Sequence, residues 1–159
     1  MTRLTIISVG TLKEDYLARA IAEYTKRLSA YCRVEEINLR EERIANEEDA
    51  ASVRAALTRE GETILSRIPE GAYTVALCVE GEMLTSETLA ARIGEAVDRT
   101  GKICFIIGSS HGLSPAVKSA AHLRLSISRL TFPHQLLRAF LPEIIYRSFT
   151  ILGGKRYHK

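Results

Sequence analysis

The sequence predicts an α/β protein with a mostly parallel sheet. Five short apolar segments alternate along the chain with five segments whose apolar residues recur at helical spacing. The segments at 73–79 and 103–108 are almost continuously apolar, which is typical of strands buried on both faces of a parallel sheet. No repeat, low-complexity tract or linker divides the 159 residues, so we expect 1–159 to form a single domain.

The first half of the chain contains three of the expected strands and two of the expected helices. Asn46 is the expected N-cap of the second helix, because acidic residues follow it in the first turn, where they suit the helix dipole. Gly61 lies inside this segment and is expected to interrupt the helix. The elements are a strand at 4–10, a helix across 17–31, a weaker strand at 34–39, a helix at 46–68, a turn at 69–71 and a strand at 73–79.

The second half continues the alternation. Ser114 is the expected N-cap of a short helix, with Pro115 at its first position. Pro142 lies within the last helical segment and should kink it or start a second helix. The elements are a helix at 85–97, a strand at 103–108, a short helix from 115, a strand at 123–128 and a helix at 134–149. In the last helix, the residues expected to point inward are Leu136, Leu137, Phe140, Leu141, Ile144 and Ile145.

Basic residues are concentrated toward the C-terminal end of the chain. The net charge is +3, but residues 101–159 contain nine Lys and Arg against one acidic residue, Glu143, and they contain all four histidines. A basic stretch of this kind favours a phosphate-bearing partner over a basic surface without a partner. We therefore expect a nucleic acid or a nucleotide to bind.

The cysteines and the apolar segments predict a cytoplasmic protein. Cys32, Cys78 and Cys104 show no paired spacing, so we expect small buried thiols in a reducing compartment. Neither Cys-x-x-Cys nor His-x3-His spacing is present, and we expect no metal site. The apolar N-terminus lacks a basic region and a cleavage site, and no apolar segment is long enough to cross a bilayer.

Three loops are expected at the carboxyl ends of strands, the edge where ligands bind in open α/β sheets. They are the loops at 80–84, 108–114 and 129–134. The loop that begins at Gly108 joins a buried strand to a helix N-terminus, so its backbone could approach a ligand closely. A tight turn without a ligand would explain the same residues, because neither a dinucleotide-binding motif nor a P-loop is present.

The loop at 129–134 combines exposed backbone groups with the apolar pair Leu130 and Phe132. Such a loop can hold an adenine ring by hydrogen bonds and packing, although the same pair could instead lie in the core. Arg138 follows His134 by four residues on the same helical face, so it could face the same cleft. His122 lies next to a strand and is expected to be structural.

Several segments resemble the bacterial large-subunit ribosomal RNA methyltransferase H family, which belongs to the SPOUT class. They are "VGTLK" (9–13), "LCVEGEMLTSE" (77–87), "GSSHGLSP" (108–115), "LTFPHQLLRAFLPEIIYRSFTI" (130–151) and the terminal "YHK" (157–159). The resemblance covers essentially the whole length. The pattern of LTFPH, a helix containing YR and a closing YH is specific to this family.

The resemblance implies a topology and a reaction that the residues alone did not predict. SPOUT proteins have an α/β fold with a mostly parallel sheet and a C-terminal trefoil knot, and the knotted loops bind S-adenosylmethionine. The family forms homodimers with the active site at the subunit interface. It methylates N3 of a pseudouridine in a stem-loop of 23S rRNA on the assembled ribosome. The alternatives are a SPOUT-type tRNA methyltransferase and a non-catalytic ribosome-binding factor of the same fold.

The resemblance also assigns residues position by position. The cofactor site corresponds to Leu77, Gly108, Ile127, Ser128, Arg129, Leu130, Thr131 and Phe132. The candidate catalytic residues near the target base correspond to His134, Arg138, Tyr157 and His158. The family often has two adjacent glycines where this chain has Gly108 and Ser109. Cofactor binding would be weaker here if the second position required a positive φ.

The C-terminal tail has an implied role in an interface site, where it can lie over the cofactor of the other subunit. Gly153 and Gly154 would form a flexible joint, and residues 155–159 are expected to be disordered alone and ordered on RNA. Tyr157 could then stack on a base.

The reaction requires the loss of the N3 proton. His158 or His134 is the expected base, and Arg138 is expected to stabilise negative charge on the neighbouring carbonyl oxygens.

Overall fold

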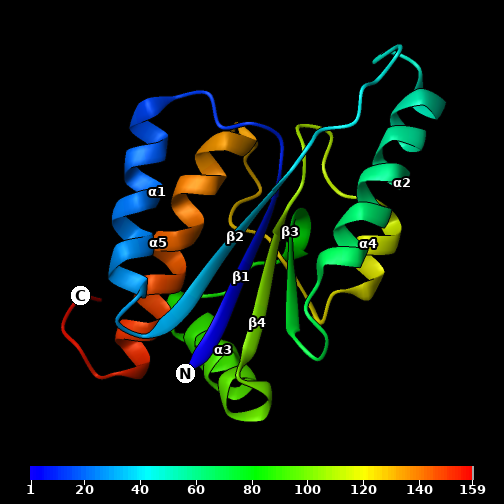
Figure 1. The fold of residues 1–159 in the computed structure, drawn as a ribbon. Coiled ribbons are helices and arrows are strands. Elements are labelled where there is room, and N and C mark those ends of the chain that lie inside the picture. Colours follow the sequence, from blue (N-terminus) through cyan, green and yellow to red (C-terminus); the bar gives the residue numbers. More distant parts are fainter. Residues whose placement is uncertain (159) are drawn as a thin grey trace.

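The computed structural model describes residues 1–158 and contains a five-stranded parallel sheet with the strand order β2-β1-β4-β3-β5 (Figure 1). The strands are β1 (Thr2–Val9), β2 (Cys32–Leu39), β3 (Tyr73–Glu82), β4 (Lys102–Ile107) and β5 (Leu123–Leu125). The helices are α1 (Asp15–Leu28), α2 (Ala50–Arg67), α3 (Ser86–Thr100), α4 (Pro115–Ala120) and α5 (His134–Leu152). The predicted α/β class and strand–helix alternation are confirmed, whereas the trefoil knot stays a prediction.

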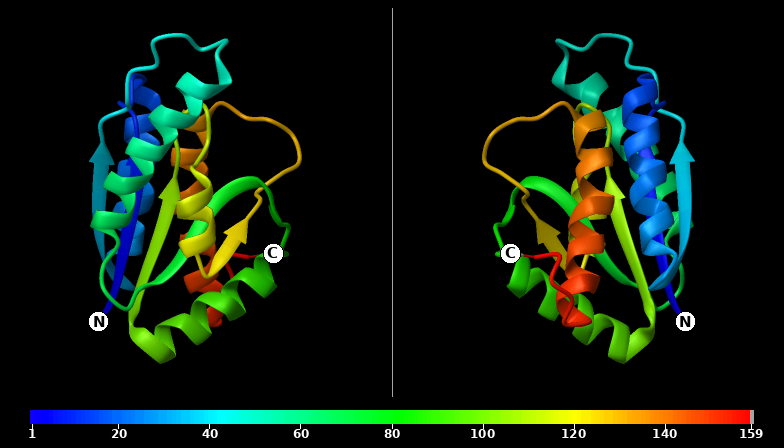
Figure 2. Two further views of the ribbon diagram at one scale, coloured as in Figure 1. Left: turned by 90° about the vertical axis from the view of Figure 1, so that its right-hand side faces the viewer. Right: turned by 90° about the vertical axis from the view of Figure 1, so that its left-hand side faces the viewer.

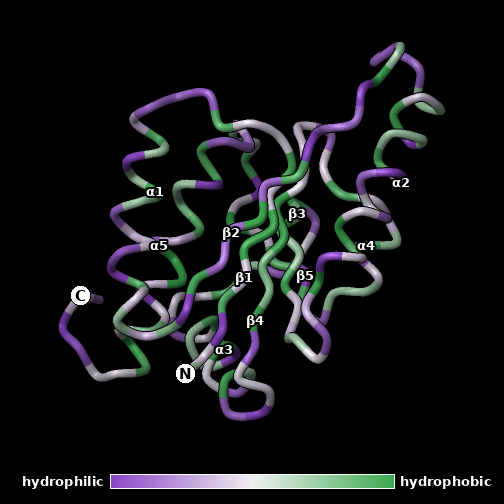
Figure 3. The backbone as a smooth tube through the Cα atoms, viewed as in Figure 1, coloured by the Kyte–Doolittle hydropathy of each residue, from purple (hydrophilic) through white to green (hydrophobic). Residues whose placement is uncertain are grey.

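Helices cover both faces of the sheet (Figure 2). α1, α3 and α5 pack on one face, where Leu4 and Phe105 of the central strands are buried. α2 and α4 pack on the other face, against Ile7 and Ile106. Successive residues of a strand point to opposite faces, so a strand covered on both sides must be apolar throughout. Figure 3 shows these apolar strands at the centre of the molecule.

Helix α2 differs from the prediction at its start and in its continuity. Its N-cap is Asp49, whose side chain accepts hydrogen bonds from the N–H groups of Ala51 and Ser52. Asn46 instead caps a turn just before the helix, because its Oδ1 accepts from the N–H of Glu48. The helix also runs without interruption through Gly61.

The reason for Gly61 is a close contact between α2 and α4. A Cβ at this position would lie less than 3 Å from Oγ of Ser114. Ser114 is the N-cap of α4, as the sequence predicts, and its hydroxyl accepts from the N–H of Val117. Glycine therefore allows the two helices to approach each other.

Strands β3 and β5 end differently from the predictions. β3 continues to Glu82, and its pairing with β5 shifts register between Leu77 and Glu82. β5 contains only Leu123–Leu125, and the N–H of Ser126 then donates to the carbonyl of Glu82. The residues of β3 between Leu77 and Glu82 do not pair with β5. Hydrophobic periodicity alone does not predict such an interruption.

Helix α5 is a single helix, although Pro142 lies inside it. Leu141 and Ile145 on either side of the proline are fully buried, so burial of this face outweighs the loss of one backbone hydrogen bond. The prediction that Phe140 points inward is wrong, because this residue is 40% exposed. Its ring meets that of Phe132 edge to face, with the centroids 6.0 Å apart.

Two smaller predictions are confirmed. Nδ1 of His122 accepts a hydrogen bond from the N–H of Thr74, so this histidine is structural. Cys32 and Cys104 are buried free thiols, and burial raises their pKa values to about 11 and about 12. Cys78 is only half-buried.

The described part of the chain contains no helix that is long and apolar enough to span a membrane.

The α2–α4 contact predicts the effect of Gly61→Ala. Alanine favours a helix interior by about 1 kcal/mol over glycine. The collision with Ser114 should outweigh this gain and lower the free energy of unfolding by about 1–3 kcal/mol. Gly94→Ala in α3 is a matched control, because its Cβ would meet only the exposed side chain of Leu152, which can move. Urea denaturation of the three proteins measures the difference. A Gly61→Ala protein as stable as the Gly94→Ala protein would contradict the tight contact.

Candidate active site

Two loops and an irregular stretch of strand meet at the carboxyl edge of the sheet and enclose a cleft of about 320 Å³. The loops follow β4 and β5, as the sequence predicts. The third wall consists of residues 77–80 within β3 itself, so the predicted contribution of a loop after that strand is wrong. Figure 2 shows the loop between β5 and α5 (orange) arching out beside the segment that follows β3 (green). All of the residues assigned to the cofactor except Arg129 line this cleft: Leu77, Gly108, Ile127, Ser128, Leu130, Thr131 and Phe132. The carried-over positions therefore lie together in space.

The loop after β4 is closed on itself at Gly108. A Cβ on this residue would lie less than 3 Å from the backbone of Gly112 and 2.9 Å from Cδ2 of Leu113. The N–H of Gly112 donates to the carbonyl of Ser109, which completes the turn. A residue larger than glycine at 108 would push this wall of the cleft out of position.

Ser109 is not strained. No residue other than glycine has a positive φ in the described part of the chain, so the condition under which Ser109 would weaken cofactor binding is not met. The side chain of Ser109 is buried. Serine is therefore compatible with this backbone.

The carboxyl of Glu60 lies beside Ser109 of the same loop, and no role for this residue was predicted from the sequence. It is 5% exposed, and its Oε2 accepts from the N–H of Glu42 at 2.8 Å. Burial raises the pKa of the Glu60 carboxyl. The Ser109 hydroxyl partly opposes this rise, although it does not reach hydrogen-bonding geometry with Oε1. The four-residue spacing of Ala56, Glu60 and Ile64 could have predicted the burial of Glu60, because it places this carboxyl on the buried face of α2.

The loop between β5 and α5 presents apolar side chains outward. Leu130 is 71% exposed and Phe132 is 36% exposed, so the alternative that this pair lies in the core is wrong. Ser128 shapes the loop, because its Oγ accepts from the N–H of Leu130 and its carbonyl accepts from the hydroxyl of Ser126. Backbone groups and apolar side chains are thus available together at the mouth of the cleft.

His134 and Arg138 are separated by the fold. His134 lines the cleft at the start of α5. Arg138 is only 7% exposed and donates hydrogen bonds to the carbonyl of Gly10 at 3.0 Å and to Oδ1 of Asn38 at 2.6 Å. Its guanidinium faces β1 and β2, so the expectation that Arg138 faces the same cleft as His134 is wrong.

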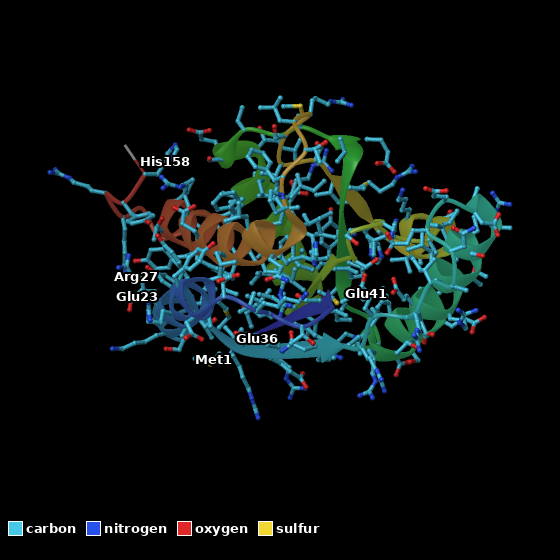
Figure 4. The ribbon with its side chains drawn as sticks, turned by 90° about the horizontal axis from the view of Figure 1, so that it is seen from above. Met1, Glu23, Arg27, Glu36, Glu41 and His158 are labelled. Atoms are coloured by element: carbon cyan, nitrogen blue, oxygen red, sulfur yellow. The ribbon has the colours of Figure 1, made fainter. Side chains whose placement is uncertain are left out.

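The surroundings of Arg138 explain its position. Burial lowers the pKa of the Arg138 guanidinium, and the charge of Glu36 opposes this change. Figure 4 labels Glu36 on β2. His134 lies at the open end of the sheet, whereas Arg138, one helical turn later, lies in the layer between α5 and the strands. The four-residue spacing therefore did not place the two side chains in one cavity.

The C-terminal tail folds back on its own subunit instead of being disordered, as far as residue 158. The N–H of Lys155 donates to the carbonyl of Thr150, and the Tyr157 hydroxyl donates to Oε1 of Glu143 at 3.2 Å. Figure 4 shows His158 at the periphery of the molecule, beyond the end of α5. Tyr157 and His158 do not line the cleft described above. Lys159, the last residue of the predicted tail, lies outside the described residues.

The ordered tail follows from contacts that its short sequence does not reveal. The ring of Tyr157 packs edge to face on Tyr146, with the centroids 4.9 Å apart, and the Arg147 guanidinium lies 4.9 Å from the centre of the Tyr157 ring. Burial and neighbouring groups, including Tyr24 and Glu143, raise the pKa of Tyr157 to about 12. The hydroxyl is therefore a donor at neutral pH.

Comparisons with known proteins agree with this architecture. A family described as "Predicted SPOUT methyltransferase" matches residues 2–158 of the chain. A ribosomal RNA large subunit methyltransferase H from Bacillus pumilus is 48% identical over 157 residues, which cover 98% of this chain and 99% of the relative.

Relatives from other bacteria have the same name. The Shouchella clausii protein is 46% identical over 158 residues and the Caldicellulosiruptor saccharolyticus protein is 44% identical over 156 residues, with 98% of this chain and 99% of each relative covered. The chain therefore belongs to the SPOUT methyltransferases and, within them, to the ribosomal RNA large subunit methyltransferase H family.

Proposed function

We propose that the chain transfers a methyl group from S-adenosylmethionine to N3 of a pseudouridine in a stem-loop of 23S rRNA, on the assembled ribosome in the cytoplasm. The observation that carries the proposal is the cleft at the carboxyl edge of the sheet, which gathers the family's cofactor positions except Arg129 from β3 and from the loops after β4 and β5. The basic C-terminal part of the chain supports an RNA substrate.

The residues of the cleft fit the cofactor. Its volume lies within the usual range for small-molecule sites. Leu77, Ile127 and Leu130 would pack against the adenine ring, while backbone groups of the loop after β5 would hydrogen-bond to its edge. The closed turn at Gly108 would let the backbone approach the ligand. When bound, S-adenosylmethionine supplies an electrophilic methyl group.

The length of α5 supports a site shared between two subunits. His134 lines the cleft at the start of this helix, and Gly153 follows its end. Its 19 residues separate the two ends by roughly 28 Å. The tail folds back toward Glu143 and Glu87, but neither Tyr157 nor His158 lines the cleft of its own chain. We propose a homodimer in which Tyr157 and His158 of each subunit complete the cleft of the other.

The histidines, Arg138 and the basic residues of the tail have different proposed roles in the reaction. A neutral imidazole is a usable base at neutral pH, so His134 of the cleft or His158 from the tail would take the proton from N3. Arg138 is a positioning residue here, because its hydrogen bond to the Gly10 carbonyl ties α5 to the loop after β1 behind His134. Lys155 and Arg156 are exposed and would contact RNA phosphates.

Methyl transfer tests the proposed reaction directly. Ribosomes that lack the modification, free large subunits and bulk tRNA are incubated separately with the protein and labelled S-adenosylmethionine. Label is expected in 23S rRNA of whole ribosomes, and nuclease mapping should place it on N3 of one pseudouridine.

Other outcomes of this assay identify the alternatives. Label in tRNA alone would indicate a tRNA methyltransferase. No label in any RNA, from folded protein that binds ribosomes, would indicate a binding factor.

The turn at Gly108 predicts a selective loss of cofactor binding. Gly108→Ala should weaken the affinity for S-adenosylmethionine by roughly tenfold or more, because the added Cβ would push the backbone of Gly112 away and displace this wall of the cleft. Ser109→Gly is the matched control and should change the affinity little, since Ser109 is unstrained. Isothermal titration calorimetry measures both. A Gly108→Ala protein that is folded and binds normally would contradict the role of this turn.

A mixed dimer tests whether the tail acts on the other subunit. One subunit has Gly108→Ala and its partner has His158→Ala, so an interface site leaves one intact cleft facing one intact tail. Such dimers should retain about half of the wild-type rate, because one of two symmetric sites remains. Purification through two different affinity tags and single-turnover methylation provide the measurement. A rate near that of the doubly mutated homodimer would show that cleft and tail act within one subunit.

A further inference from the structure

Charged side chains from α3 and α5 hold the tail in place. Oε1 of Glu143 accepts from the Arg147 guanidinium at 2.5 Å and from the Tyr157 hydroxyl at 3.2 Å. Nη1 of Arg147 lies 3.3 Å from Nδ1 of His158, and Oε1 of Glu87 lies 2.7 Å from Nε2 of the same ring. Both ring nitrogens of His158 therefore face a group of known hydrogen-bonding character.

These two partners determine where a neutral His158 holds its hydrogen. A guanidinium can only donate, so the Nδ1 atom that faces Arg147 must accept. The hydrogen is then on Nε2, which points to the carboxylate of Glu87. The other neutral tautomer, with the hydrogen on Nδ1, would direct a bare nitrogen at the carboxylate and an N–H at the guanidinium, and both contacts would be unfavourable.

Glu87 itself is held at the start of α3. It lies in the first turn, after the N-cap Thr85, whose side chain accepts from the N–H of Thr88. A hydrogen bond from its own backbone N–H and the contact with His158 lower the pKa of the Glu87 carboxyl. The start of a helix also favours a negative charge. The carboxylate is therefore ionised and oriented at neutral pH.

We propose that Glu87 is a positioning residue for His158, because its carboxylate selects the Nε2–H form of the ring and fixes the ring beside Arg147 and Tyr157 before RNA binds. The inference rests on the proposed function, in which the tail acts on the target base. Residues Gly154, Lys155 and Arg156 are exposed, and Tyr157 is held by Tyr146 and Glu143. The orientation of the His158 ring rests on its contacts with Arg147 and Glu87.

Three variants isolate this role. Glu87→Ala removes the acceptor, whereas Glu87→Gln removes the charge and retains a carbonyl oxygen that can accept from Nε2–H. Glu95→Ala is the matched control, because Glu95 is exposed about two turns further along the same helix. Thermal unfolding of each variant separates an effect on the stability of α3 from an effect on the tail.

The first readout is the ring of His158 in ¹⁵N-labelled protein without RNA or cofactor. The wild type and Glu95→Ala should show one neutral tautomer with the hydrogen on Nε2 and a rigid backbone at Tyr157 and His158. Glu87→Ala should show a mixture of tautomers and a mobile tail. Glu87→Gln should restore most of the wild-type spectrum. An unchanged His158 ring in Glu87→Ala overturns the proposal.

The second readout is methylation kinetics on unmodified ribosomes. Glu87→Ala should lower kcat by roughly tenfold and change KM by less than about twofold, because misorientation affects the reacting geometry more than ribosome binding. Glu87→Gln should recover most of kcat. An unchanged kcat in a protein whose tail has become mobile would overturn the positioning role. If the ring depends on Glu87 but no RNA is methylated, the proposed function fails while the contact itself is supported.

Discussion

The close approach of Gly108 to the backbone of Gly112 is the constraint on which the candidate site depends. β4 is a central strand of the sheet, and this turn begins directly at its carboxyl end. The backbone of the loop occupies the space that a side chain at 108 would need. The loop can therefore form one wall of the cleft with its N–H and carbonyl groups rather than with side chains. The other two walls are the irregular part of β3 and the loop that follows β5.

The helices α2 and α4 beneath this wall are closely packed. α2 approaches α4 at Gly61 and Ser114, and the buried carboxyl of Glu60 binds the segment that precedes α2. An ionisable group in such a place is normally unfavourable unless its bonds are satisfied. The Glu60 carboxyl therefore lies between Glu42 of the preceding segment, whose N–H donates to Oε2, and Ser109 of the loop.

Helix α5 gives the molecule its division into two regions. One end of the helix contributes to the cleft, and the other end carries the tail with its Tyr157–Glu143 and His158–Glu87 bonds. A tail that is ordered in advance loses less conformational freedom when RNA binds than a disordered tail would lose. In a symmetric dimer, the same rigid helix would carry each tail toward the partner's cleft.

The sequence by itself determined the alternation of strands and helices, the parallel sheet and two of the three loops expected at its edge, those after β4 and β5. These features arise from local periodicity, capping residues such as Ser114 and the apolar character of doubly covered strands. The motif resemblance also identified positions that the fold gathers around the cleft. Local patterns were sufficient to predict these features because each of them depends on a few residues that are neighbours in the sequence.

Only the tertiary structure decided the features that depend on residues far apart in the chain. Gly61 looked like a helix breaker, but the proximity of Ser114 explains it as a contact residue. Arg138 was expected beside His134, but Gly10 and Asn38 draw it into the layer between α5 and the sheet. The tail was expected to be disordered, but Tyr146 and Glu143 of α5 hold Tyr157, and Glu87 on α3 holds His158. These partners are brought together by the tertiary fold, which no local pattern predicts.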